Sequence, residues 1–167
     1  MKFLKYKKEQ WIWILLRIGM SWIFLWPFLD KLFGLGFATA KDSSWLSGTS
    51  PTAGFLQHAT KGPFAGFYQS LTGSILVDWI FMIGILLIGV SLLLGICVKI
   101  SGYSGALLFF LMYTAGFIPP EHNPFLDEHI IYLVIMIGLT FVKAGHWLGL
   151  GKWWSQQELV KKYPILE

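Results

Sequence analysis

WIFMIGILLIGVSLLLGICV, residues 79–98, contains no charged side chain, and neither does the stretch that follows, ISGYSGALLFFLMYTAGFIPP at residues 100–120. A helix rises about 1.5 Å per residue, so each stretch is long enough to cross the ~30 Å hydrocarbon layer of a membrane. The sequence therefore predicts two membrane-spanning helices, over about residues 78–98 and 101–118. A very short turn joins them, so they should form an antiparallel hairpin.

A third apolar run, residues 11–33, precedes this hairpin and is interrupted by Arg17. Asp30 and Lys31 lie near its end. We expect this run to be the first span. The composition of the whole chain agrees, because only 13% of the 167 residues are charged while 55% are apolar. A soluble domain of this length needs more polar surface than that.

The fourth predicted span covers residues 124–142, which carry no charge from Ile130 onward. Asn123 is a suitable N-cap for it, and Pro124 is favoured at the first helical position. The sequence therefore predicts one all-α domain over residues 1–167, an integral membrane bundle of four helices. The only cysteine, Cys97, has no partner for an internal disulfide or a CxxC motif.

The lysines predict an orientation, because basic residues concentrate on the cytoplasmic side of membrane proteins. With a cytoplasmic N-terminus, an even number of crossings puts nine lysines inside and three outside, and both termini in the cytoplasm. These basic residues lie at the ends of apolar segments, which indicates a lipid bilayer and not nucleic acid as the partner. The inner lysines are Lys2, Lys5, Lys7, Lys8, Lys99, Lys143, Lys152, Lys161 and Lys162, and the outer ones are Lys31, Lys41 and Lys61.

Residues 34–77, between the first two spans, form an outer segment rich in glycine and aromatic residues. The dipeptides Ser50–Pro51 and Gly62–Pro63 are typical of helix starts, so we expect short interfacial helices over the outer mouth of the bundle. Two interpretations stay open: a loop that lies on the membrane, or a lid that shapes a pocket for an amphiphile. The pattern Ala38-Thr39-Ala40 also leaves open a cleaved signal peptide, although the preceding apolar run is long.

Small residues on the two central spans predict close helix packing. They are Gly84, Gly89, Ser91 and Gly95 on the second span, and Gly102, Gly105 and Ala106 on the third.

Ionisable residues within or beside the hydrocarbon are costly, so they are candidates for function. Arg17 either reaches back to the cytoplasmic headgroups or faces inward as an anchor for an anionic or carbonyl-bearing ligand. Asp30 and Lys31, at the outer end of the first span, are expected at the same depth as the start of the last helix. All three are candidate ligand-binding residues.

The DEHIIY motif that begins at Asp127 supplies the other candidates. On a helical wheel Glu128, His129 and Tyr132 fall within about 100° of one another, while Asp127 points about 200° away from His129. We therefore expect Glu128, His129 and Tyr132 to face a ligand pocket and Asp127 to form a structural ion pair with Lys31. Structural pairing alone and a proton-handling role both remain open for these acids.

The histidine pattern predicts no metal site. No histidine lies deep in a span, so a haem between the helices would lack its usual axial ligand. A zinc site would require the outer loops to gather His58, His122, Glu121 and His129. The chain also has no phosphate-binding glycine loop, nucleophile elbow or HExxH motif, which argues against a self-contained nucleotide enzyme or hydrolase.

The most specific motif is NPFLDEHIIY at residues 123–132. It belongs to a set of motifs that are spread along nearly the whole chain. The others are WIFLWPFLDKLFGLG at 22–36, SPTAGF at 50–55, GPFAGF at 62–67, VDWIFM at 77–82 and LGLGKWW at 148–154. Together these motifs resemble the DoxX/DoxD family of small four-span prokaryotic membrane proteins. The resemblance implies the prokaryotic cytoplasmic (inner) membrane and an association with sulfur metabolism, because DoxD is the small membrane subunit of a thiosulfate:quinone oxidoreductase.

The positions that match the family are Asp30, Lys31, Asp127, His129 and Tyr132. Related members of the wider redox clan use paired cysteines, which this chain lacks. We therefore expect a membrane subunit of a quinone-linked oxidoreductase, which binds a quinone or similar amphiphile near the outer face. A second protein subunit would supply the electrons, and a homo-oligomer is the other expected assembly. The alternative is a non-catalytic membrane scaffold or assembly partner for a soluble redox protein.

Overall fold

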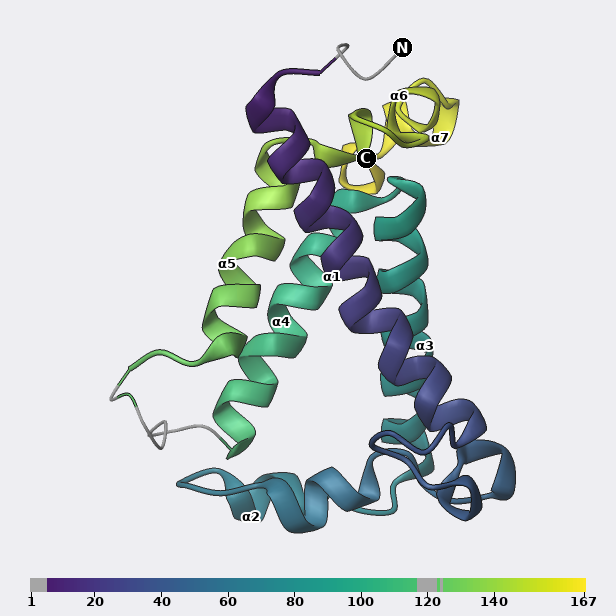
Figure 1. The fold of residues 1–167 in the computed structure, drawn as a ribbon, viewed down its shortest axis with the longest axis vertical. Helices are drawn as coiled ribbons and strands as arrows, with labels where there is room; N and C mark the ends of the chain where they lie inside the picture. Colours follow the sequence, from purple (N-terminus) through teal and green to yellow (C-terminus); the bar gives the residue numbers. More distant parts are fainter. Residues whose placement is uncertain (1–5, 117–122, 124) are drawn as a thin grey trace.

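The computed structural model describes residues 6–116, 123 and 125–167, and all regular secondary structure in these ranges is helical (Figure 1). The four longest helices pack chiefly as two pairs, α1 with α3 and α4 with α5, and the turn between α3 and α4 joins the pairs. Their bounds are Lys8–Phe33 for α1, Ile75–Leu94 for α3, Val98–Gly116 for α4 and Glu128–Phe141 for α5.

Three of these helices, α1, α3 and α4, are long and apolar enough to cross a membrane. Helix α5 has 14 residues and therefore rises only about 21 Å, less than the ~30 Å of a hydrocarbon core. The prediction that Asn123 caps this helix is wrong, because Asp127 is its N-cap. The Asn123 side chain instead accepts hydrogen bonds from the backbone N–H groups of Phe125 and Leu126.

Large apolar side chains cover the outside of the long helices as well as their core. Leu15, Leu87 and Leu107, on α1, α3 and α4, are 65%, 59% and 58% exposed. A monomeric soluble protein rarely exposes so many large apolar side chains on its long helices. This surface suits a lipid environment and agrees with the three apolar helices.

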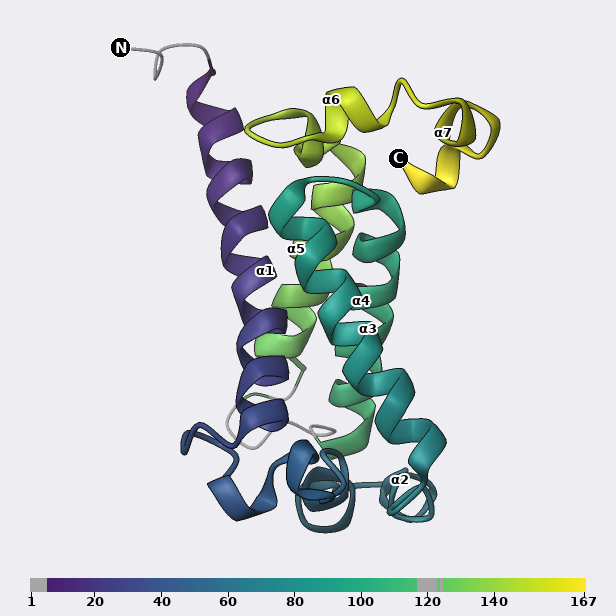
Figure 2. The ribbon, with the colours of Figure 1, turned by 90° about the vertical axis from the view of Figure 1, so that its right-hand side faces the viewer.

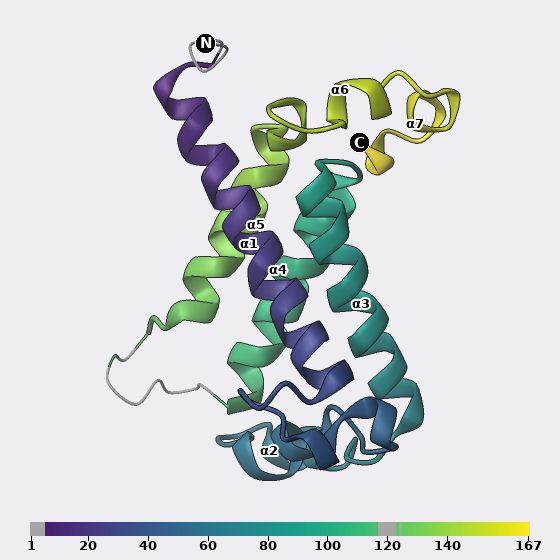
Figure 3. The same ribbon diagram turned by 45° about the vertical axis from the view of Figure 1, so that its right-hand side comes forward.

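The two ends of the bundle are named here after the short helices that lie there (Figure 3). The α6 end holds the start of α1 and the C-terminal segment, which contains η5 (Ala144–His146), α6 (Gly151–Trp154), α7 (Glu158–Lys162) and η6 (Pro164–Leu166). The α2 end holds the segment between α1 and α3, with η2 (Lys41–Ser43), η3 (Trp45–Ser47), η4 (Phe55–Ala59) and α2 (Ala65–Gln69). Figure 2 shows α6 and α7 extending sideways beyond the long helices.

The segment at the α2 end contains the short helices expected after its two proline dipeptides, as η4 and α2. It is tied to the end of α4, because the Lys61 N–H donates to the Ala115 carbonyl at 2.9 Å. The Tyr68 and Thr114 hydroxyls are 2.6 Å apart and add a second link. The segment therefore covers this end of the bundle and reaches from α1 to α4.

Glycines allow close approach at both helix pairs. A Cβ on Gly89 would lie 2.7 Å from the Leu25 side chain, and one on Gly102 would lie 2.6 Å from the Thr140 side chain. Gly105 likewise faces Met136. The predicted glycine packing is confirmed at these positions, but it is wrong for Gly84, which has no neighbour within 4 Å of its added Cβ.

Candidate functional site

The Asp127 carboxylate organises the first turn of α5. Its Oδ1 accepts hydrogen bonds from the backbone N–H groups of His129 at 3.1 Å and Ile130 at 3.2 Å, as an N-cap does. Its Oδ2 lies 2.8 Å from Nδ1 of His129. Both side chains are about nine-tenths buried. One carboxylate thus caps the helix and fixes the orientation of an imidazole ring.

This geometry corrects the helical-wheel argument. Asp127 has an extended backbone, with φ −129° and ψ −177°, so it does not follow the 100° rotation of a helical residue. The predicted Lys31–Asp127 ion pair is not formed among the described residues, because Asp127 uses its oxygens on the start of its own helix. Figure 1 also shows the far end of α1 beside α3, whereas α5 begins on the opposite side of the molecule.

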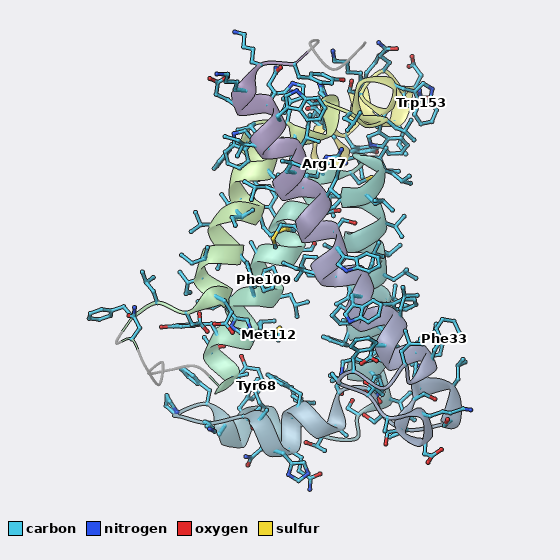
Figure 4. The ribbon with its side chains drawn as sticks, in the orientation of Figure 1. Arg17, Phe33, Tyr68, Phe109, Met112 and Trp153 are labelled. Atoms are coloured by element: carbon cyan, nitrogen blue, oxygen red, sulfur yellow. The ribbon has the colours of Figure 1, made fainter. Side chains whose placement is uncertain are left out.

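Asp127 and His129 form a dyad, and Phe109 on α4 connects this Asp127–His129 dyad to the core. Its ring centroid is 6.2 Å from that of His129 and 5.3 Å from that of Tyr132, one turn further along α5. On its other side it packs at 5.1 Å against Phe24 of α1. In Figure 4, Phe109 and Met112 both project from α4 toward the space between the two helix pairs. His129 and Tyr132 therefore both lie against the Phe109 ring.

Glu128, the first residue of α5, is exposed. Ligand atoms of Asp127, Glu128 and His129 lie within 4.8 Å of one another. Nδ1 of His129 already contacts Asp127, so an ion bound through that nitrogen would have to displace this contact.

Asp30 belongs to a different structure at the α2 end. Its carboxylate is 2% exposed and accepts hydrogen bonds from the backbone N–H groups of Phe37, at 3.3 Å, and Ala38, at 3.0 Å. It therefore fixes the turn that follows α1. Asp30 and the adjacent Lys31 are not brought to the Asp127–His129 dyad.

Arg17 faces inward and is fully buried. Its guanidinium donates to the carbonyls of Leu92 and Leu93 at the end of α3, and to those of Trp147 and Leu148 in the loop before α6. Carbonyls in the last turn of a helix have no partner within the helix, so Arg17 supplies one. These four acceptors pair the two terminal nitrogens of the guanidinium, whereas its buried Nε has no hydrogen-bond partner among the described residues.

A second polar cluster lies at the α6 end, in a cavity of about 300 Å³. Nζ of Lys143 lies 2.8 Å from Oε2 of Glu167. Nε2 of His146 lies 3.1 Å from Oε1 of Glu167, within ion-pair distance but without hydrogen-bond geometry. The hydrogen bond from Lys143 lowers the pKa of Glu167, and the charges of Lys143, His146 and Lys99 add to this effect against the opposing effect of burial.

Sequence reasoning missed two residues of these sites. Phe109 lies within an apolar run in which nothing distinguishes it from its neighbours. Asp78, in the first turn of α3, is 6% exposed and lines a cavity at the α2 end. A buried acid in the first turn of a predicted span, after a segment rich in Ser and Thr, was the available signal for Asp78.

Comparison of the chain with models of known protein families, with curated proteins and with solved structures finds no match.

Proposed function

We propose that the chain is the membrane subunit of a quinone-linked redox system and binds a quinone, or a similar carbonyl-bearing amphiphile, beside the Asp127–His129 dyad. In this proposal all four long helices lie in a prokaryotic inner membrane, with the α6 end in the cytoplasm. The observation that carries the proposal is the 2.8 Å contact between Oδ2 of Asp127 and Nδ1 of His129.

A carboxylate on Nδ1 fixes the orientation of an imidazole ring and the direction in which its other nitrogen points. An imidazole held in this way is suited to lie beside a carbonyl oxygen of a quinone headgroup. When the quinone takes up two electrons from a partner subunit it also takes up two protons, one through the imidazole and one from water. The dyad is therefore suited to hold a headgroup that changes its protonation during reduction.

The surroundings of the dyad suit a flat, apolar headgroup. Phe109 of α4 packs against both the imidazole and the Tyr132 ring of α5, and Phe24 extends the aromatic wall to α1. The Tyr132 hydroxyl makes no hydrogen bond with a described residue, so a ligand carbonyl could accept one from it. An isoprenoid tail would follow the apolar outer surface of the helices.

The electrons must come from another subunit. The chain has one cysteine and therefore no dithiol, and no histidine of the described segments lies in the middle of a long helix. The chain is thus proposed as the quinone-binding part of a two-subunit enzyme. The resemblance of the NPFLDEHIIY motif to the DoxX/DoxD family supports this role. In that case the partner subunit would oxidise thiosulfate.

The test is quinone binding by the purified chain in detergent, with a short-chain ubiquinone and a short-chain menaquinone as probes. Tryptophan fluorescence quenching gives the affinity, and size-exclusion chromatography checks the fold. We expect His129→Ala to weaken binding of the preferred quinone by at least about tenfold, the loss of one charge-assisted hydrogen bond. Phe109→Leu should weaken it about threefold.

His58→Ala is the matched control, because His58 is an exposed histidine in η4 at the same end of the bundle. It should leave the affinity unchanged. Equal quinone affinities for the parent, His129→Ala and His58→Ala, all eluting as folded protein, would remove the dyad from the site. No binding of either quinone by the parent chain would reject the proposed function.

A second candidate function rests on the C-terminal segment. Trp153 and Leu159 in α6 and α7 are 56% and 55% exposed, and Lys152 and Lys161 lie beside them in the chain. An exposed apolar and basic segment beyond the bundle can hold a soluble redox protein at the membrane. If so, Trp153→Ala should abolish co-purification of a specific soluble partner without changing quinone binding.

A further inference from the structure

A cavity of about 280 Å³ lies at the α2 end, where α3 begins and the preceding segment folds back over it. Its lining residues include Trp45, Trp79, Thr49, Ser50 and Asp78. The cavity is separate from the Asp127–His129 dyad, because none of its lining residues belongs to α4 or α5. The proposed function does not use it.

The polar group in this cavity is the Asp78 carboxylate, which is 6% exposed. Its Oδ1 accepts hydrogen bonds from the hydroxyls of Ser50, at 2.8 Å, and Thr52, at 2.5 Å. Its Oδ2 has no hydrogen-bond or ion-pair partner among the described residues. Within the same part of the chain, no Lys, Arg or His neutralises the carboxylate at ion-pair distance. Buried charges are ordinarily paired, so the free oxygen points to a cationic ligand.

Two tryptophans complete the site. The rings of Trp45 and Trp79 meet edge to face, with centroids 4.7 Å apart and planes at 72°. Tryptophan has the strongest attraction for cations among aromatic side chains, and pairs or cages of such rings bind alkylated ammonium groups. A carboxylate next to two tryptophans is thus complementary to a group that is positively charged and partly apolar.

The chemistry of the walls separates an organic cation from a metal ion. Calcium and magnesium take six or more oxygen ligands, and Asp78 is the only carboxylate among the lining residues. An anion would be repelled by Asp78. The volume is slightly below that of common small-molecule pockets, so the ligand should be a headgroup or a small amine.

We infer that this cavity binds an organic ammonium group, with the charge on Oδ2 of Asp78 and the alkyl portion against Trp45 and Trp79. Two sources carry such a group: the headgroup of an ethanolamine or choline phospholipid, and a soluble amine. The cavity lies where α3, one of the apolar helices, begins, and Trp79 is 52% exposed beside it. A lipid headgroup could therefore reach it from the side.

The experiment has a soluble arm and a lipid arm, both with the full chain in neutral detergent. In the soluble arm, ligand-observed NMR titration measures the affinities for choline and ethanolammonium. In the lipid arm, native mass spectrometry measures which lipid is retained from an equal mixture of phosphatidylethanolamine and phosphatidylglycerol. Binding in the soluble arm identifies a free amine as sufficient, whereas selective retention of phosphatidylethanolamine alone identifies the lipid source.

Asp78→Asn keeps an amide oxygen for Ser50 and Thr52 but removes the charge. It should weaken ammonium binding, or reduce the retained phosphatidylethanolamine, by at least about tenfold. Trp79→Leu, at a half-exposed position, should weaken it about threefold and serves if Asp78→Asn does not fold. Asp42→Asn, an exposed acid on η2 outside the cavity, should change neither readout.

Absence of binding in both arms for the parent chain would overturn the inference. So would equal binding by the parent and by folded Asp78→Asn or Trp79→Leu protein. Quinone binding is measured separately at the dyad, so a failure here leaves the proposed function unaffected, and the reverse also holds.

Discussion

The guanidinium of Arg17 donates a 2.7 Å hydrogen bond to the carbonyl of Leu148, a residue 131 positions later in the chain. The same guanidinium holds the end of α3, 75 and 76 positions away. One side chain from the first helix therefore joins three segments at the α6 end. The buried charge therefore has a structural role, because the hydrogen bonds of its two terminal nitrogens all go to backbone carbonyls.

Arg17→Ala should destabilise the fold more than any exposed substitution on α1. It leaves several buried carbonyls without a donor, at a cost of about 3 kcal/mol or more. The melting temperature in detergent should fall by roughly 6 °C or more. Lys8→Ala, an exposed position at the start of the same helix, is the control and should change it little. Equal melting temperatures for the two variants would contradict the structural role.

The two roles of Asp127 can be separated by two substitutions. Asp127→Asn retains an oxygen for the helix N-terminus but loses the charge beside His129, so stability should stay within about 0.5 kcal/mol while quinone binding weakens. Asp127→Ala loses the cap as well and should cost about 1 kcal/mol in addition. Thermal melting and quinone titration of both variants check this. If Asn were as destabilising as Ala, the charge and not the cap would hold the turn.

The long helices can be predicted from the sequence because each one depends on a continuous apolar run. Uncharged runs longer than a membrane crossing predict α3 and α4 within a few residues, and α1 differs from its prediction only at its start. The start of α5 was misplaced because Asn123 and Asp127 are both good N-caps four residues apart. Composition cannot choose between them, and the choice shortens the helix to 14 residues.

The candidate site was predictable in part. His129 and Tyr132 lie on one face of α5, as helical periodicity requires, and both meet Phe109. The partner of Asp127 was not predictable by the same rule, since a residue at an N-cap is not helical. The partners of Arg17 depend on contacts between segments far apart in sequence, which no local pattern encodes.

Gly102→Ala and Gly84→Ala form a matched pair for the contribution of helix packing. A methyl group on Gly102 would lie 2.9 Å from the Met136 carbonyl oxygen, so α4 and α5 must separate, at a cost of about 1–3 kcal/mol. Gly84 faces open space in α3, and alanine there should stabilise by up to about 1 kcal/mol through helix propensity. Melting temperatures in one detergent give the comparison. A stabilising Gly102→Ala would mean that α4 and α5 are not in this close contact.

The attachment of the C-terminal segment should depend on pH through Glu167. The pKa of its carboxyl is lower in the folded protein than its ordinary value of 4.5, chiefly because Lys143 donates a hydrogen bond to it. A lowered folded pKa adds stability that is fully present above 4.5 and is lost as the pH falls through the folded value. Amide hydrogen exchange in α6 and α7 should therefore increase, relative to the intrinsic rate, below that pH. Glu167→Gln should show the faster exchange already at neutral pH and lose the acid-dependent step, and Glu158→Gln, whose carboxylate is 97% exposed, should behave like the parent. An acid-dependent step that persists in Glu167→Gln would assign the titration to another group.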